Sequence, residues 1–158
     1  MTDRVTFDLT AEETLPHAIE KFWEAFPPVW NRIRGHLRLI LASQFNITIE
    51  EFHTLRSLRQ GFCSVSQLAD VQQISRPAAS QVVEALVEKG LVSRHYDAKD
   101  RRHIRLEVTP AGNELINTIF QKNRGWMMEK MAALGPEEFA AIVKAMEALK
   151  GAFVERDA

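Results

Sequence analysis

SVSQLADVQQISRPAASQVVEALVEKGLVSRHYDAKDRRHIRLEVT, residues 64–109, contains the signals of two short helices followed by a hairpin. Ser64 has an amide side chain three residues later, which is the spacing of a capped helix start, and a short half-apolar helix follows. Ser75 caps a second helix whose first turn holds Pro77, where a missing N–H costs nothing. The connection between the two helices is too short for anything but a sharp turn. The spacing predicts a helix-turn-helix.

The second of these helices, expected over residues 75–89, has an apolar stripe and a short polar side. The stripe consists of Ala79, Val82, Val83 and Leu86. On the polar side, Arg76 suits a guanine or a phosphate, Gln81 suits an adenine, and the Ala78 methyl suits a thymine methyl. An ordinary solvated helix face is the open alternative for these residues.

A basic hairpin follows the second helix. Ile104, Leu106 and Val108 alternate with polar residues, which predicts a half-buried strand, and residues 91–96 can pair with it. The loop between them, residues 97–103, carries three Lys or Arg side chains against two carboxylates. Such a loop can reach a neighbouring minor groove, where narrow A·T-rich segments concentrate negative potential. A plain polar turn is the alternative.

The strand and its exit contain a motif. Asp100-Arg101-Arg102 through Val108-Thr109 fits the pattern D-x-R-x5-L-T with Val for Leu, and Gly112 follows at the x-x-G position. On these residues, on the helix start at residues 74–76 and on residues 88–92, the chain resembles the MarR family of winged-helix bacterial transcription regulators. Gln73 departs from the pattern, because many relatives have a turn Gly there.

The resemblance implies a mainly α fold with a small β-hairpin wing, in which terminal helices intertwine into a homodimer. It also implies release from DNA by a small aromatic or phenolic acid that binds between the dimer and DNA-binding regions. Trp30, Arg34 and His53 are candidate residues for such an effector site, although packing or solvated roles are the alternative for each.

The candidate DNA contacts lie at the two helix starts and in the hairpin loop: Ser64, Ser75, Arg76, Pro77, Ala78, Ser80, Gln81, Lys99, Arg101 and Arg102. Asp100 is expected to pair with an arginine and hold the loop. The net charge of −1 does not oppose DNA binding, because residues 56–110 hold nine Lys or Arg against six Asp or Glu. Only this local field matters at a phosphate backbone.

Helical patterns flank the hairpin region on both sides. Residues 1–46 are expected to form an extension and a dimerisation helix, with a break at Pro27-Pro28, and residues 47–109 the DNA-binding region. A capping box at Thr48 opens the helix that runs to about residue 60. Residues 110–158 are expected to be dimerisation helices. Their stripes carry more apolar surface than one small subunit can cover, which also indicates a homodimer.

The remaining composition excludes several classes of function. At 158 residues the chain suits one compact domain, and it has neither an apolar run of membrane-spanning length nor the pattern of a signal peptide, so we expect a cytoplasmic protein. The single Cys63 is expected to be a buried structural thiol. No Gly-rich phosphate loop and no ligand-spaced His or Cys cluster occurs, so no cofactor, metal or enzymatic activity is expected.

These observations predict a dimeric, sequence-specific DNA-binding transcription regulator, a repressor by expectation, that binds an inverted-repeat operator in double-stranded DNA. The alternative is a winged-helix module that binds a protein partner and no longer binds DNA. The charged wing argues against that alternative, because an interaction module has no need of a basic tip.

Overall fold

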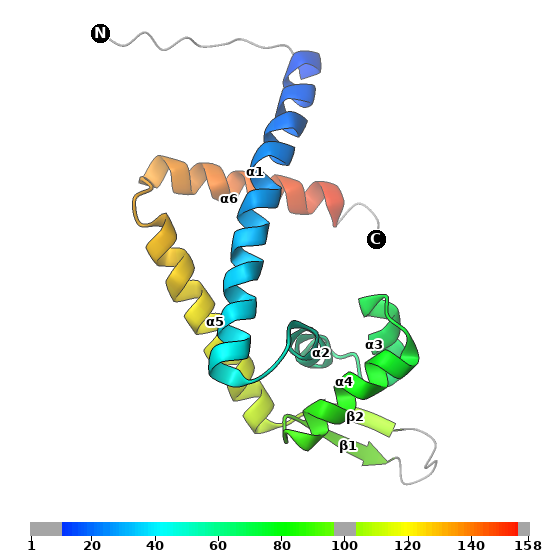
Figure 1. Ribbon diagram of the computed structural model, residues 1–158. Helices are drawn as coiled ribbons and strands as arrows, with labels where there is room; N and C mark the ends of the chain where they lie inside the picture. The colour runs from blue at the N-terminus through cyan, green and yellow to red at the C-terminus, as the bar shows by residue number, and fades with distance from the viewer. Residues whose placement is uncertain (1–10, 97–103, 155–158) are drawn as a thin grey trace, which may run out of the picture. The chain divides into compact units, whose positions relative to one another are not determined.

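The computed structural model describes residues 11–96 and 104–154, and Figure 1 shows the order of their helices and strands. The elements are α1 (Ala11–Ile40), the short π-helix η1 (Leu41–Phe45), α2 (Ile49–Arg59), α3 (Val65–Gln72), α4 (Arg76–Glu88), β1 (Val92–Tyr96), β2 (Ile104–Val108), α5 (Pro110–Met131) and α6 (Pro136–Phe153). The described chain is therefore mainly helical with a two-stranded antiparallel hairpin, which confirms the predicted fold class.

The chain divides into two compact units, Met1–Ile119 and Phe120–Ala158. The first unit holds α1 to β2 and the first part of α5, and it contains the buried core. The second unit holds the rest of α5 and α6, and none of the residues of α6 is buried.

The N-terminal helix is continuous, so the predicted break at Pro27 and Pro28 is wrong. A proline inside a helix removes one backbone hydrogen bond and costs about 3 kcal/mol or more. Aromatic rings stack along this part of the helix: the ring centroids of Phe22 and Phe26, before the prolines, lie 4.9 Å apart, and those of Phe26 and Trp30 lie 6.4 Å apart. The contacts of Phe26 with Trp30 join the turns on both sides of the prolines. A local rule that treats proline as a helix breaker does not include them.

The second helix begins at the predicted capping box. The Thr48 hydroxyl accepts a hydrogen bond from the Glu51 N–H over 3.1 Å, and the Glu51 carboxylate accepts one from the Thr48 N–H over 2.8 Å. Two of the otherwise unpaired N–H groups at the helix start are thereby satisfied. The helix ends before Gly61, whose positive φ of 106° favours glycine.

Apolar residues of α2, α3, α4, the hairpin and α5 form the core of the first unit. Its largest fully buried side chains include Phe52, Leu55, Leu68, Val83, Leu86, Ile116 and Ile119. Truncating such a leucine to alanine typically costs about 2–5 kcal/mol. The core therefore holds α4 firmly by its apolar stripe, as the periodicity of that helix predicts.

The hairpin pairs in a regular antiparallel register, from Val92 opposite Val108 to Tyr96 opposite Ile104. Val92 and Leu106 are buried, whereas the side chains of Ile104 and Arg105 are exposed. The β2 strand also meets the chain before α3, because the Leu106 N–H donates to the Cys63 carbonyl over 2.9 Å. The hairpin is thus fixed to the start of the helix-turn-helix at the middle of β2.

Candidate nucleic-acid interface

The first helix of the motif starts at the predicted cap. The Ser64 hydroxyl accepts a hydrogen bond from the Gln67 N–H over 3.2 Å. The Gln67 side chain reaches back to the Cys63 N–H over 2.9 Å, one residue earlier than in a standard capping box. Ser64 is half-buried. Cys63 is half-buried too, rather than buried as predicted, because it lies in the segment between α2 and α3 and not inside a helix.

The turn between the helices uses a left-handed residue. Gln73 has φ 54° and ψ 43°, and its N–H bonds back to the last turn of α3. A glycine would take this backbone conformation without strain, whereas a residue with a Cβ bears a cost. The turn geometry expected for the motif is therefore present despite the departure at this position.

The second helix of the motif, α4, exposes its polar side and buries its apolar side. The Ser75 hydroxyl accepts from the Ala78 N–H over 3.3 Å and caps the helix start. The exposed residues are Ser75, Arg76, Pro77, Ser80 and Gln81, with Ala78 half-buried, and the buried ones are Ala79, Val83 and Leu86. A helix held on one side by the core and bare on the other can enter a groove without losing its packing.

An ion pair links the hairpin to α4. The Arg94 guanidinium on β1 lies 2.6 Å from the Glu84 carboxylate on α4. No local signal in the sequence marks this pair, since the two residues stand on different elements. It adds a polar contact between α4 and β1, whose apolar residues share the core.

The predicted wing residues Lys99, Asp100, Arg101 and Arg102 lie outside the described residues. On the described strands, Glu107 has two charged or polar neighbours: the Arg105 guanidinium lies 3.3 Å from its carboxylate and the His95 ring 3.4 Å. These exposed groups lie on the outer face of the hairpin, on the strands that lead to the predicted tip.

A hollow of about 430 Å³ lies elsewhere on the first unit, between α1, α2 and the end of α3. Arg34 and His53 both line it, together with Arg56 and the apolar Val71 and Ile74. Trp30, the third candidate effector residue, is not among its lining residues, and its ring stacks on Phe26 instead.

Electrostatics in this hollow favour a neutral histidine. Partial desolvation lowers the pKa of His53 below its ordinary value of 6.5, and the guanidinium groups of Arg56 and Arg34 lower it further. The Glu50 carboxylate, which also lines the hollow, acts in the opposite direction on this pKa. With two guanidinium groups against one carboxylate, the lining suits a ligand that brings negative charge.

Within residues 11–96 and 104–154, no three His, Cys, Asp or Glu side chains are grouped so as to hold a metal ion. In the same residues, every helix is too short or too polar to traverse a lipid bilayer. A capped helix, a tight left-handed turn, a second helix with a bare polar side and an antiparallel hairpin together define a winged helix-turn-helix, a class of DNA-binding domain.

Comparison with known proteins agrees with this class. The MarR family model matches residues 47–104. The chain is 28% identical over 117 residues to the HTH-type transcriptional regulator YpoP of Bacillus subtilis, covering 73% of this chain and 82% of that protein.

Solved structures share the fold. A transcriptional regulator from Thermotoga maritima aligns with a TM-score of 0.72 at 22% identity, over 87% of this chain and 96% of that one. A mutant of Staphylococcus aureus MepR bound to an oligodeoxyribonucleotide aligns with a TM-score of 0.65 at 22% identity, over 83% and 96%. Residues 47–104 thus match the MarR family of transcriptional regulators, and the chain is similar to HTH-type transcriptional regulators over most of its length. Members of this family are transcription factors rather than enzymes.

Proposed function

We propose that the protein is a dimeric, sequence-specific repressor that binds an inverted-repeat operator. The observation that carries this proposal is the exposure of Arg76, Ser80 and Gln81 on a helix whose opposite side is locked into the core. Guanidinium and amide groups at the start of such a helix can pair with base edges in the major groove. We place the protein in the cytoplasm, where this DNA lies.

The contacts are assigned by chemistry. Arg76 and Gln81 read bases, Ala78 meets a thymine methyl, and Pro77 leaves room for close approach. The capping hydroxyls of Ser64 and Ser75, together with Ser80, hydrogen-bond phosphates. In the wing, Lys99, Arg101 and Arg102 reach the flanking minor groove, and Asp100 orders that loop through an arginine.

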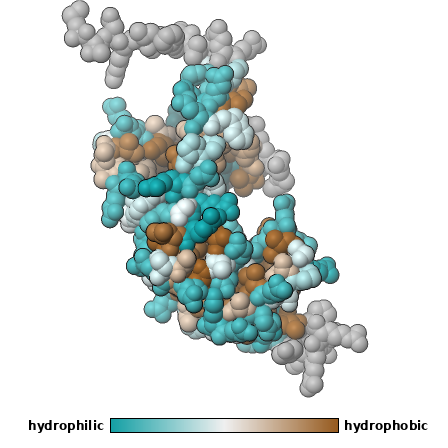
Figure 2. All heavy atoms as spheres, in the orientation of Figure 1, coloured by the Kyte–Doolittle hydropathy of each residue, from teal (hydrophilic) through white to brown (hydrophobic). Residues whose placement is uncertain are grey.

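A second copy of the chain covers the apolar surface of α6. This helix of 18 residues buries none of its side chains, and Figure 2 shows apolar residues exposed along it. The exposed apolar residues of α6 are Phe139, Ile142, Val143, Met146 and Phe153. An exposed apolar surface of this extent marks an association site. Two recognition helices related by a two-fold axis then require two half-sites in opposite orientation.

An effector that releases the DNA binds the hollow beside Arg34 and His53. Its size of about 430 Å³ suits a small molecule. The guanidinium groups pair with a carboxylate, and the apolar side chains of Val71, Ile74 and Ile49 accept an aromatic ring. A ligand here shifts the protein away from DNA if it binds the DNA-incompetent arrangement more tightly.

Selection of bound duplexes from a random-sequence pool tests the proposed function. We expect enrichment of an inverted repeat, with loss of enrichment for Arg76→Ala and retention for Lys122→Ala, an exposed lysine of α5. A pool that stays random with the unchanged protein would refute DNA recognition and favour a protein-binding module.

The effector site has its own test. Phenolic acids are expected to raise the Tm of the unchanged protein and of Arg32→Gln, whose arginine is exposed on α1 outside the hollow. The shift should be lost in Arg34→Gln. Equal shifts in both variants, or no shift in any, would exclude this hollow as the site.

A further inference from the structure

A buried carboxylate holds the C-terminal end of α4, which is the recognition helix of the proposed function. Lys89 is the C-cap residue of α4, and its Nζ lies 2.7 Å and 2.8 Å from the two carboxylate oxygens of Glu51 on α2. The same Nζ donates to the Asn46 carbonyl oxygen over 2.9 Å. An ammonium group has three N–H donors, so these three acceptors use its full capacity.

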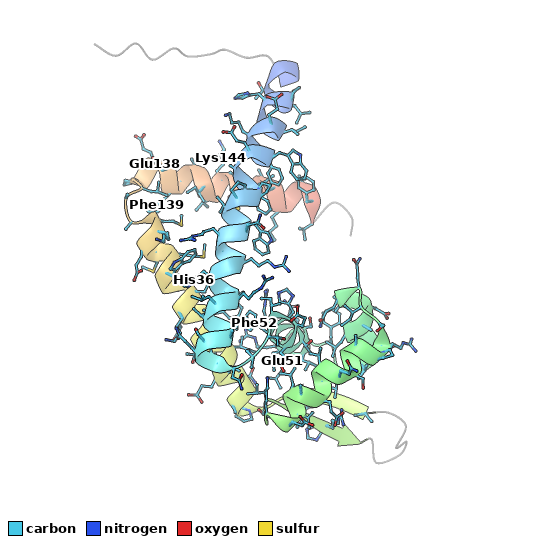
Figure 3. The ribbon with its side chains drawn as sticks, in the orientation of Figure 1. His36, Glu51, Phe52, Glu138, Phe139 and Lys144 are labelled. Atoms are coloured by element: carbon cyan, nitrogen blue, oxygen red, sulfur yellow. The ribbon has the colours of Figure 1, made fainter. Side chains whose placement is uncertain are left out.

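The carboxylate is equally occupied. Glu51 lies on α2 (Figure 3), its side chain is only 6% exposed, and it also accepts the N–H of Thr48 in the capping box. A buried charge is tolerated when it is paired and hydrogen-bonded, and removal of its partner is costly. The Lys89–Glu51 pair is therefore a fixed contact, unlike the exposed pair of Lys21 and Glu24 on α1.

The third partner of Lys89 belongs to the connection between the N-terminal helices and α2. Asn46 follows η1 in a left-handed conformation, and its N–H bonds back to Leu41. The lysine thus joins the end of α4 to the residue at which the chain leaves η1 for the DNA-binding region. This contact reaches far along the sequence, since Lys89 and Asn46 are 43 positions apart.

We infer that Lys89 and Glu51 are positioning residues that set the orientation of the recognition helix through the Asn46 turn, and that Lys89 does not contact DNA. From its charge and position alone, a lysine at the end of a recognition helix is a candidate for a phosphate contact. Its three donors are instead directed at Glu51 and Asn46. The inference rests on the proposed function, in which α4 reads the operator.

We call the contact of Lys89 with Glu51 and Asn46 the clamp. The test compares the clamp variants Lys89→Met, Glu51→Gln and their double variant with the matched exposed changes Lys21→Met and Glu24→Gln. The Glu51→Gln change preserves the cap, because a glutamine at this capping-box position still accepts the N–H of Thr48. The double variant leaves no buried charge without a partner, so it serves where Lys89→Met fails to fold. Circular dichroism establishes that each variant is folded before binding is measured.

Each folded protein is titrated with the selected operator and with random duplex over a range of salt concentrations. We expect the clamp variants to bind the operator about 2- to 30-fold more weakly, the range for residues that act on a ligand without touching it. The ratio of operator to random-duplex affinity falls by a similar factor, and the salt slope stays unchanged. The double variant should lose no more operator affinity than the single variant that binds the operator more weakly, because both changes break the same contact.

Two results would overturn the inference. One is operator affinity and specificity equal to those of the control variants. The other is a salt slope reduced by about one in Lys89→Met but not in Glu51→Gln, which is the signature of a lost phosphate contact.

Hydrogen–deuterium exchange without DNA keeps the inference testable if the unchanged protein selects no operator. The last turn of α4 should then exchange faster in both single clamp variants than in the controls. Equal exchange would refute the clamp, whereas faster exchange without operator selection would refute only the proposed function.

Discussion

The Thr109 hydroxyl donates a hydrogen bond to the Gly90 carbonyl oxygen over 2.8 Å, which joins the residue after β2 to the second residue after α4. The same hydroxyl accepts the Gly112 N–H over 3.1 Å in the first turn of α5. One threonine thus connects the chain after α4, the end of the hairpin and the first turn of α5. This contact gives a physical reason for the T-x-x-G part of the motif.

Gly112→Ala is expected to destabilise the protein by about 1–3 kcal/mol, the usual cost of overpacking. An added Cβ would meet the Leu91 carbonyl oxygen and the Val108 side chain closer than atoms can approach, with backbone as one of the partners. Urea unfolding measures the change. Gly125→Ala in the same helix is the control: nothing lies within 4 Å of its added Cβ, so a gain of about 0.5–1 kcal/mol is expected. Similar effects of both changes would contradict this packing.

Gln73→Gly is expected to stabilise the protein by about 0.5–1 kcal/mol, because the left-handed backbone at φ 54° strains a residue with a Cβ. The control is Gln121→Gly, which places glycine inside α5 and should cost about 1 kcal/mol. The free energy of unfolding from urea titration gives both values. A loss of stability at both positions would show that the turn gains nothing from glycine.

Folding stability is expected to fall at acid pH through His53. Its pKa is lowered in the folded protein, so between 6.5 and that lowered value the unfolded chain binds a proton that the folded chain does not. This contribution to stability is complete above pH 6.5 and is lost as the pH falls through the folded pKa. His53→Gln should flatten the loss in urea titrations over this window. An unchanged pH profile would mean that the histidine titrates alike in both states.

Gln81→Ala is expected to cost about 1–3 kcal/mol in operator binding and to relax the preference at one base pair. The exposed amide is then a base contact rather than a solvated group. Competition binding with operators changed at single positions checks this, with Gln121→Ala as the exposed control on α5. A uniform loss on all operators would instead indicate a phosphate contact.

Local signals carried most of the sequence prediction. The caps at Thr48, Ser64 and Ser75 lie where their spacing placed them, since a cap depends on residues within one turn. The apolar stripe of α4 likewise predicted the buried side chains Ala79, Val83 and Leu86, whereas Val82 of the same stripe is half-buried.

Contacts between distant residues were not predictable in this way. The Lys89–Glu51 pair joins positions 38 apart, and no local pattern marks it. A different error was local: the helix continues through Pro27 and Pro28, where the proline rule predicts a break, and Phe26 stacks on Trp30 across them. The hollow also depends on packing between separate helices, which the sequence pattern does not give. Of the three candidate effector residues, Arg34 and His53 line it and Trp30 does not.

The most direct test of the central claim is operator affinity as a function of the spacing between half-sites. A two-fold dimer presents its recognition helices at the pitch of B-form DNA, so affinity should peak when the half-site centres lie about 34 Å apart, one helical turn. Inserting about half a turn of DNA should reduce binding to the level of random duplex. Affinity that does not change with the insertion would contradict the account.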